Sequence, residues 1–275
     1  TTSFTAQQTA EAMLNLARAG FTPGQIQDMI GPMLNLSRAT GADLATASDI
    51  AAVAIRAFNL SAADTTRVAD VLTATANNSA QTIQDLGEAL KYVAPAAADA
   101  GMTLEDTAMT IGVMANYGIR GSMAGTAMRQ ALIRLANRDT QKMLMEVFGV
   151  SVLDAEGNVR RLHEVLKDLD KAMSHLTAGE RVAVMQEIFD LRGMSVGLKV
   201  ASADLSQLEG ALKNAQGTAA RVAEEMDAGL GGAQRRLASA AEGLGHAIGA
   251  SLDESLIGFL DSLTAALTVL TEFIQ

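Results

Sequence analysis

The chain has 275 residues, enough for one large or two ordinary domains, and carries a formal net charge of −10 at neutral pH. Apolar residues make up 49% of the sequence and aromatic residues only 3%, while cysteine and tryptophan are absent. The apolar content argues against a disordered chain, the lack of cysteine excludes disulfides and thiolate chemistry, and the acidic balance argues against direct recognition of nucleic acid.

The apolar residues are mainly alanine, leucine and methionine, which favour helices. Proline occurs only at positions 23, 32 and 95, so long stretches can continue as helix. We therefore predict an all-α protein, built mostly as a multi-helix array and followed by a C-terminal coiled-coil-like helix. Residues 1–139 are expected to form the helical repeat region.

Helix starts are well marked along the first two-thirds of the chain. The run Thr22-Pro23-Gly24-Gln25 combines a capping threonine, proline at the first helical position and a glutamine that can bond back to the cap. Thr103 and Thr177 are each followed three residues later by an acid, which predicts the same arrangement. Ser61 and Ser79 are predicted to start further helices after short polar breaks.

The first half of the chain shows signs of an internal duplication. Ala19-Gly20-Phe21-Thr22 and Ala100-Gly101-Met102-Thr103 each end an alanine-rich helix and cap the next one. We predict two related multi-helix units, about 1–78 and 79–139, because repeated supersecondary units suit a packed helical array.

A glycine-rich corner interrupts the helices near the middle of the chain. Gly118, Gly121 and Gly125 lie close together, and a helix-forming run follows at once. Glycine permits positive φ angles and close backbone approach, so we predict a tight turn and then a closely packed helix, capped by Ser122 or Thr126. The stretch lacks the Lys-Ser/Thr ending of a phosphate loop. The methionines around it are predicted to fill the core, with an adaptable methionine-lined groove as the alternative.

Residues 140–205 are predicted to hold a short β-hairpin followed by helices. Gly149-Val150-Ser151-Val152-Leu153 is prone to form a strand, and Asp154-Ala155-Glu156-Gly157-Asn158 supplies a turn, so the hairpin covers 149–160. The acids of this turn raise the alternative of a calcium loop, but the later ligands of an EF-hand are missing. We therefore favour a plain hairpin turn around Gly157.

Residues 206–275 are predicted to consist of a glycine-rich junction and a long amphipathic helix. The flexible junction is placed at residues 229–249, where glycine is frequent and the apolar pattern is loose. Residues 255–271 contain a single charge, so a membrane span is the alternative to a buried bundle or coiled-coil helix. The favoured interpretation is an oligomer seam with 3.5-residue spacing, formed by Leu256, Leu260, Leu263, Leu267, Leu270 and Ile274.

The sequence contains no recognisable catalytic, cofactor-binding or metal-binding motif. His163, His175 and His246 lie on separate segments without metal-ligand spacing, so each is predicted to be a helix-surface residue. The carboxylates are spread along helix faces, and no pair stands out as acid and base. We therefore predict no enzymatic activity and no cofactor.

Several short blocks of residues occur in a distinctive order along about the first 200 positions. They are Val68 to Leu72, Leu86 to Ala94, Ala100 to Asp106, Gly118 to Arg129, Asp154 to Val159, Glu180-Arg181 and Ile188-Phe189. Together these blocks resemble the core region of phage tail tape measure proteins of the TP901-1 type. Such proteins usually carry glycine after the phenylalanine, where this chain has Asp190, and this departure concerns the local turn.

The resemblance implies a structural virion protein that is made in the host cytoplasm and lies in the lumen of the tail tube. Such a protein sets tail length, scaffolds tail assembly and is released during genome ejection. The implied partners are the tail tube protein, tail assembly chaperones and tail tip or baseplate proteins, besides self-association through helices. The alternative is a membrane-active ejection protein that contacts the host membrane and forms a channel or anchor through its C-terminal helix.

The chain has neither an initiator methionine nor a natural end to its last apolar pattern, so we expect a piece of a longer protein. Its most informative residues are predicted to hold turns and anchor the core rather than bind a ligand. They are Gly101, Gly118, Gly121, Gly125, Gly157 and Phe189. Replacing Gly121 by valine should destabilise the corner by more than ~1 kcal/mol if its φ is positive.

Overall fold

The computed structural model describes residues 4–155 and 157–249. Within these residues there are thirteen α-helices, one short 3₁₀ helix and no strand, so the predicted all-α fold is confirmed. They belong to two compact units. The larger is Glu11–Met226, and the smaller is formed by the two ends of the chain. The predicted subdivision at residues 139 and 205 stays a prediction.

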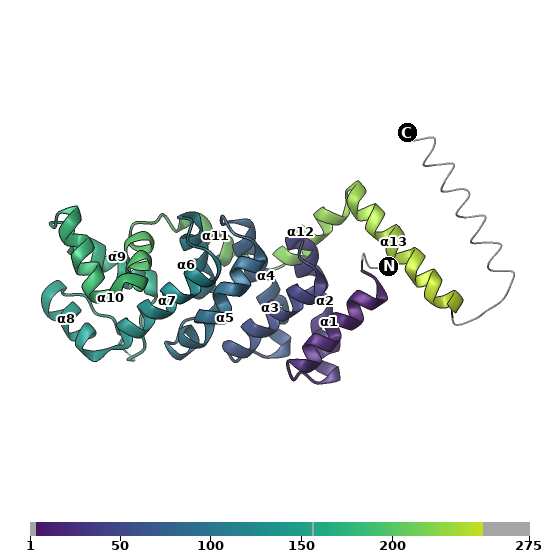
Figure 1. Cartoon of the computed structure of the whole chain (residues 1–275), viewed down its shortest axis with the longest axis horizontal. Coiled ribbons are helices and arrows are strands. Elements are labelled where there is room, and N and C mark those ends of the chain that lie inside the picture. Colours follow the sequence, from purple (N-terminus) through teal and green to yellow (C-terminus); the bar gives the residue numbers. More distant parts are fainter. Residues whose placement is uncertain (1–3, 156, 250–275) are drawn as a thin grey trace. The chain divides into compact units, whose positions relative to one another are not determined.

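The larger unit is a two-layered stack of helices. One layer contains α2, α4 and α6, and the other contains α3, α5, α7 and α10, each helix contacting the next one in its layer. Figure 1 shows α2 to α7 in succession along this unit, with α10 beside α7. The helices are α1 (Ala6–Arg18), α2 (Pro23–Thr40), α3 (Leu44–Ala57), α4 (Thr65–Asn77), α5 (Ile83–Asp99), α6 (Leu104–Asn116), α7 (Gly121–Ala136), α8 (Arg138–Phe148), α9 (Leu162–Ala172), α10 (Ala178–Ala201), α11 (Ser206–Lys213) and α12 (Thr218–Asp227).

Most of the predicted helix starts are confirmed. Thr22 and Thr177 form complete capping boxes, and the Thr103 hydroxyl accepts the N–H of Asp106. Ser61 caps a 3₁₀ turn, Ala62–Asp64, that leads into α4. The prediction for Ser79 is wrong, because its hydroxyl bonds back to a carbonyl of α4 and Thr82 caps α5 instead.

One kind of turn joins successive helix pairs in the stack. Gly20, Asn59 and Gly101 all have positive φ, of 86°, 50° and 78°. In each case the next N–H bonds to the carbonyl five residues before it, from Phe21 to Leu16, from Leu60 to Ile55 and from Met102 to Ala97, which is the Schellman arrangement of helix ends. The turns recur about 40 residues apart, as expected of stacked helical repeats. The sequence indicated the first and third turns but not the second.

Glycines let the helices of the second layer approach closely. A Cβ on Gly87 of α5 would lie 2.5 Å from the Ile50 side chain of α3. A Cβ on Gly125 of α7 would lie 2.3 Å from the Ala89 carbonyl oxygen of α5. Because no real Cβ tolerates such distances, glycine at these two positions fixes how closely the helix axes approach.

The last helices of the larger unit, α11 and α12, pack against helices from its middle. Helix α11 contacts α4 and α6, and the Asp70 carboxylate of α4 accepts the N–H groups of Gly217 and Ala219 at 2.7 and 2.9 Å. Asp70 is only 3% exposed. Its charge therefore lies against the positive N-terminus of α12 and caps that helix from a position far away in sequence.

The described residues of the predicted hairpin, 149–155 and 157–160, contain a single antiparallel bridge, between Leu153 and Val159, and no assigned strand. The Asp154 carboxylate accepts the N–H of Asn158 at 2.8 Å, and Gly157 has a φ of 87°. The carboxylate that suggested a calcium ligand thus helps to close the turn, as Asp side chains commonly do.

The described part of the smaller unit contains α13 (Leu230–Gly249), and the predicted flexible junction at 229–249 is therefore wrong for all but its first residue. Good helix formers outweigh the cost of its glycines. The Ser239 hydroxyl donates to the Phe4 carbonyl at 2.8 Å, and Arg235 pairs with Asp227 at 3.1 Å. The predicted oligomer seam lies outside the described residues. No helix that the structure describes has the length and apolarity needed to cross a membrane.

Candidate functional site

The glycine-rich corner is the start of α7. Gly118 ends α6 with a φ of 82°, and Gly121 begins α7 with a φ of 56°. Because the helix begins before Ser122, neither Ser122 nor Thr126 can cap it, and that prediction is wrong. Arg120 occupies the cap position and makes no capping bond with its side chain.

Helix α10 lies closely on α7 at Gly193, and Phe189 packs on Gly197 within α10. Phe189 is completely buried. A Cβ on Gly197 would lie 3.0 Å from the Phe189 ring, and a Cβ on Gly193 would lie 3.3 Å from the Ala131 backbone nitrogen of α7. Phe189 therefore packs against Gly197 of its own helix, and a larger residue in place of Gly193 would push α10 away from α7.

Asp190 breaks α10 into two helical segments. Its φ of 61° and ψ of 172° are non-helical and lie in a region that only glycine adopts easily. The Asp190 carboxylate accepts the N–H of Leu191 at 2.7 Å and lies 3.7 Å from the Arg134 guanidinium. The residue that departs from the tape measure pattern is thus the one at which glycine would relieve the backbone.

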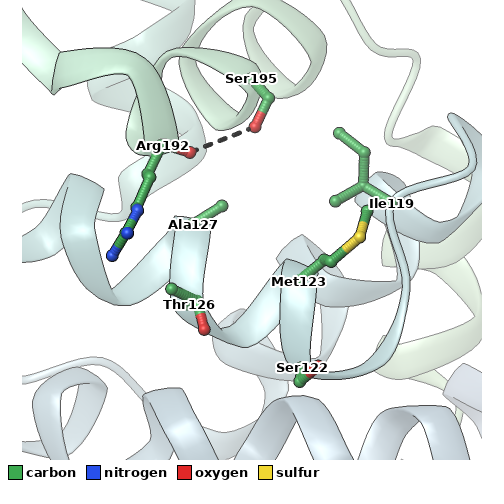
Figure 2. A pocket seen from close by; sticks show the side chains of 7 residues that line it. All are labelled: Ile119, Ser122, Met123, Thr126, Ala127, Arg192 and Ser195. Atoms are coloured by element: carbon green, nitrogen blue, oxygen red, sulfur yellow. Dashed lines mark hydrogen bonds between the residues drawn. The ribbon is translucent and has the colours of Figure 1, made fainter.

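An open groove of about 420 Å³ lies between α7 and the second segment of α10. Figure 2 shows Arg192 and Ser195 of α10 on one side, and residues of α7 and the turn before it on the other. The lining residues on the second side are Ile119, Ser122, Met123, Thr126 and Ala127. The prediction that the methionines near the corner fill the core is wrong for Met123, which is 63% exposed at this groove, and for Met145, which is 50% exposed. It is confirmed for Met102, Met109, Met114 and Met128, which are buried.

The two segments that line the groove are basic, although the chain as a whole is acidic. Residues 117–138 and 191–203 contain no aspartate or glutamate. Lys199 lies over the Tyr117 ring, 5.4 Å from its centre. The exposed cations of these two segments are Arg120, Arg129, Arg138, Arg192 and Lys199.

The groove offers no arrangement for acid–base or nucleophilic chemistry, because Arg192 is the only ionisable group that lines it. Within residues 4–155 and 157–249, no group of three or more histidines and carboxylates is placed to hold a metal ion. The groove is therefore better suited to contact a surface than to transform a small molecule.

His163 corrects one sequence prediction, since it is 8% exposed rather than on the helix surface. Its Nδ1 atom is buried without a hydrogen-bond partner. Burial lowers the pKa of His163, and the positive charge of Arg161 lowers it further. Arg161 itself donates to the Asp106 carboxylate and joins α9 to α6. His175 is exposed as predicted.

The six glycine and phenylalanine positions singled out in the sequence fall at two places. Gly118, Gly121 and Gly125 lie in α7 or in the turn before it, and Phe189 lies on α10, which packs on α7. Gly101 lies at the turn between α5 and α6, where a Cβ would be 3.9 Å from the Asn158 Cβ, next to Gly157. Gly101 thus lies against the turn that contains Gly157, at a corner separate from α7.

Comparison with known proteins places the chain in a family. Residues 1–190 match the model of a family described as phage-related minor tail protein. The chain belongs to this family. The resemblance to phage tail proteins seen in the ordered sequence blocks is therefore confirmed, and the chain is a structural component of a phage tail.

Two relatives of this phage tail chain carry more specific names. The tape measure protein of Pneumococcus phage Dp-1 is 36% identical over 271 residues, and the probable tape measure protein of Escherichia phage P2 is 30% identical over 275 residues. Each comparison covers 97% of this chain. The chain spans only 24% of the first relative and 33% of the second. No solved structure matches it.

Sequence reasoning missed several residues that shape this tail chain. Asp70 gave one available signal, because it is an acid within the apolar run Val68 to Leu72, and a buried acid needs a partner. Its partners could not be identified, since they lie almost 150 residues further along. Gly193 and Arg192 gave no signal, because their roles depend on the crossing of α7 and α10.

Proposed function

We propose that the chain is a helical part of a tape measure protein, which lies in the tail tube lumen, sets tail length, scaffolds assembly and leaves during genome ejection. The observation that carries this proposal is the similarity of nearly the whole chain to two proteins with that name. The role is structural and non-enzymatic. It includes self-association through the apolar seam of residues 256–274 and contacts with the tail tube protein, tail assembly chaperones and tail tip or baseplate proteins.

The stacked helices make a specific prediction about length. A continuous helix advances about 1.5 Å per residue, so a repeat of about 40 residues would measure ~60 Å when extended. The same repeat in the stack advances by the distance between neighbouring helices, about 10 Å. The contribution of one repeat to tail length therefore reports whether this part of the ruler is extended or folded in the tail.

The test is an in-frame deletion of residues 44–82 from the phage gene, which removes α3, α4 and the turns around them. Asp43, which caps α3, would then precede α5 in place of its own cap, Thr82. The ruler role predicts intact tails that are shorter by ~60 Å if the repeat is extended, or by about 10 Å if it stays folded. The distributions of tail length are measured by electron microscopy.

The matched control is Gly179→Ala, in the first turn of α10, where a Cβ meets open space; this variant should leave tail length unchanged. Tails of unaltered length after the deletion would overturn the ruler role. If those tails also failed to deliver DNA, the result would favour an ejection role instead.

A further inference from the structure

We propose that α10 is a two-state element, which is bent at Asp190 in the folded stack and can straighten into one continuous helix. Asp190 is the single non-helical residue between Ala178 and Ala201. The bend combines a strained backbone, contacts that only a bent helix can make, and an apolar pattern that continues through it. Straightening would be a property of the folded chain, whether or not the chain acts as a ruler.

The backbone of Asp190 favours straightening. Its φ of 61° and ψ of 172° lie where a residue with a Cβ is strained, and this strain would disappear if Asp190 adopted helical angles. No proline occurs in α10, so every residue of the helix can take part in a continuous hydrogen-bond ladder. The bend is therefore held by side-chain contacts and not by the local sequence.

Contacts between the two segments of α10 hold the bend. A Cβ on Gly197 would lie 2.9 Å from the Met185 sulfur and 3.0 Å from the Phe189 ring, so glycine makes room for both side chains. Met185 and Gly197 are twelve residues apart in sequence, which corresponds to about 18 Å along a continuous helix. Their contact therefore exists only in the bent form.

Each segment is also anchored to a different neighbour. Arg181 of the first segment forms an ion pair with Asp170 of α9, and Gly193 of the second segment lies against the Ala131 backbone of α7. Arg161 in turn joins α9 to α6. Because α9 and the second segment are both held by the stack, straightening would detach the first segment from α9. Loss of the contacts with α9 is thus the event that releases the bend.

The apolar residues of α10 stay in phase through the bend. In a continuous helix one stripe, apolar except for a serine, would have successive spacings of four, three, four and three residues, through Val184, Ile188, Leu191, Ser195 and Leu198. This 3.5-residue spacing is typical of helices that pack along their whole length. In the bent helix the stripe is split, because Ile188 is buried and Leu191 is 65% exposed. The sequence thus suits a continuous helix as well as the bent one.

Two spin labels on the full chain would report the state of α10, since the sequence contains no cysteine. Ala183→Cys and Lys199→Cys place the labels at exposed positions of the two segments. These residues lie sixteen positions apart, about 24 Å along a continuous helix, whereas the contact between Met185 and Gly197 keeps the segments close in the bent helix. Pulsed electron spin resonance measures the distances, with labelled chains diluted by unlabelled ones.

Two substitutions should shift the balance toward the continuous helix. Asp190→Ala keeps the strain of the bent form but suits a helix, and Gly197→Ala places a methyl group against Met185 and Phe189. Together they should raise the ratio of long to short distances by at least about tenfold and make a narrow long-distance peak the main one. Asp190→Gly should remove any long-distance component. Glu187→Ala removes an exposed carboxylate at a helical position of α10 and, as the matched control, should leave the distances unchanged.

Each other result overturns the proposal. Distances in the double variant that match those of the unaltered chain would show that the bend is fixed. A broad distribution with a loss of helix content in circular dichroism would show that the substitutions unfold the segment and do not straighten it. Because the deletion of residues 44–82 leaves α10 intact, failure here is distinguishable from failure of the ruler role.

Discussion

Replacing Asp190 by glycine should stabilise the protein, although the substitution removes an ion pair. The φ and ψ of Asp190, 61° and 172°, belong to a region that costs a residue with a Cβ about 1–3 kcal/mol. Glycine would remove this cost. At this position the chain departs from the glycine of the tape measure pattern, so the variant also tests the physical reason for that glycine.

The expected gain follows from several opposing terms. The exposed ion pair with Arg134 contributes at most about 1 kcal/mol, because both side chains are well solvated. The greater freedom of glycine in the unfolded chain costs about 0.4–1 kcal/mol. The substitution also removes the acceptor of the exposed Leu191 N–H, which water can replace. With about 2 kcal/mol of relieved strain, the free energy of unfolding of Asp190→Gly should rise by up to about 1 kcal/mol.

Asp190→Ala is the matched control, because it removes the same carboxylate but keeps the Cβ. It should be less stable than the unaltered chain, and less stable than Asp190→Gly by about 1–2 kcal/mol. Urea unfolding followed by circular dichroism gives the midpoints, which are comparable where the slopes agree. Equal midpoints for the glycine and alanine variants, or a higher one for alanine, would show that the backbone at this break is unstrained.

Three further predictions concern the Asp70 cap of α12, the glycine contact between α5 and α7, and the buried His163. Asp70→Ala would leave the N-terminal N–H groups of α12 without their acceptor and should lower the free energy of unfolding by about 1–3 kcal/mol. Gly125→Ala would force a Cβ against α5 and should cost about 1–3 kcal/mol, whereas Gly179→Ala, in open space, should gain up to about 1 kcal/mol. The lowered pKa of His163 means that the unfolded chain binds its proton more readily, so stability should fall as the pH drops below about 6.5, and His163→Phe should reduce that dependence. Urea midpoints measured for each variant check the first two expectations, and unchanged midpoints would refute them. Midpoints of the unaltered chain and of His163→Phe measured at several pH values check the third, which would be refuted if the two proteins showed the same dependence on pH.

The features predicted correctly from the sequence are local ones. The capping box at Thr22 needs only residues within one helical turn, and the helical class follows from composition and spacing. The turn at Asn59 was missed although it matches those at Gly20 and Gly101. Asparagine is the non-glycine residue that best tolerates a positive φ, but a sequence pattern based on glycine does not find it.

The features that were missed depend on long-range packing. Asp70 is recognisable as unusual, but only the fold brings α12 to it. The groove depends on the close approach of α7 and α10, which Gly193 permits where it meets the Ala131 backbone. Conversely, the predicted junction at 229–249 relied on glycine content alone, whereas the surrounding alanine, leucine and arginine residues of α13 favour a helix strongly enough to continue through its glycines.

The architecture bears on how a ruler could leave the tail. In a stack where helices contact mainly their neighbours, stability is close to a sum of local terms, so the stack can open from one end, one repeat at a time. The exception is formed by the contacts of α11 with α4 and α6 and by the hydrogen bonds between the start of α12 and Asp70 of α4, because they tie the end of the stack to its middle. Pulling from the C-terminal side would first separate Asp70 from α12, a small group of hydrogen bonds, and only then the buried apolar layers. Under the proposed function, extension would thus proceed by successive small steps rather than by one large cooperative unfolding event.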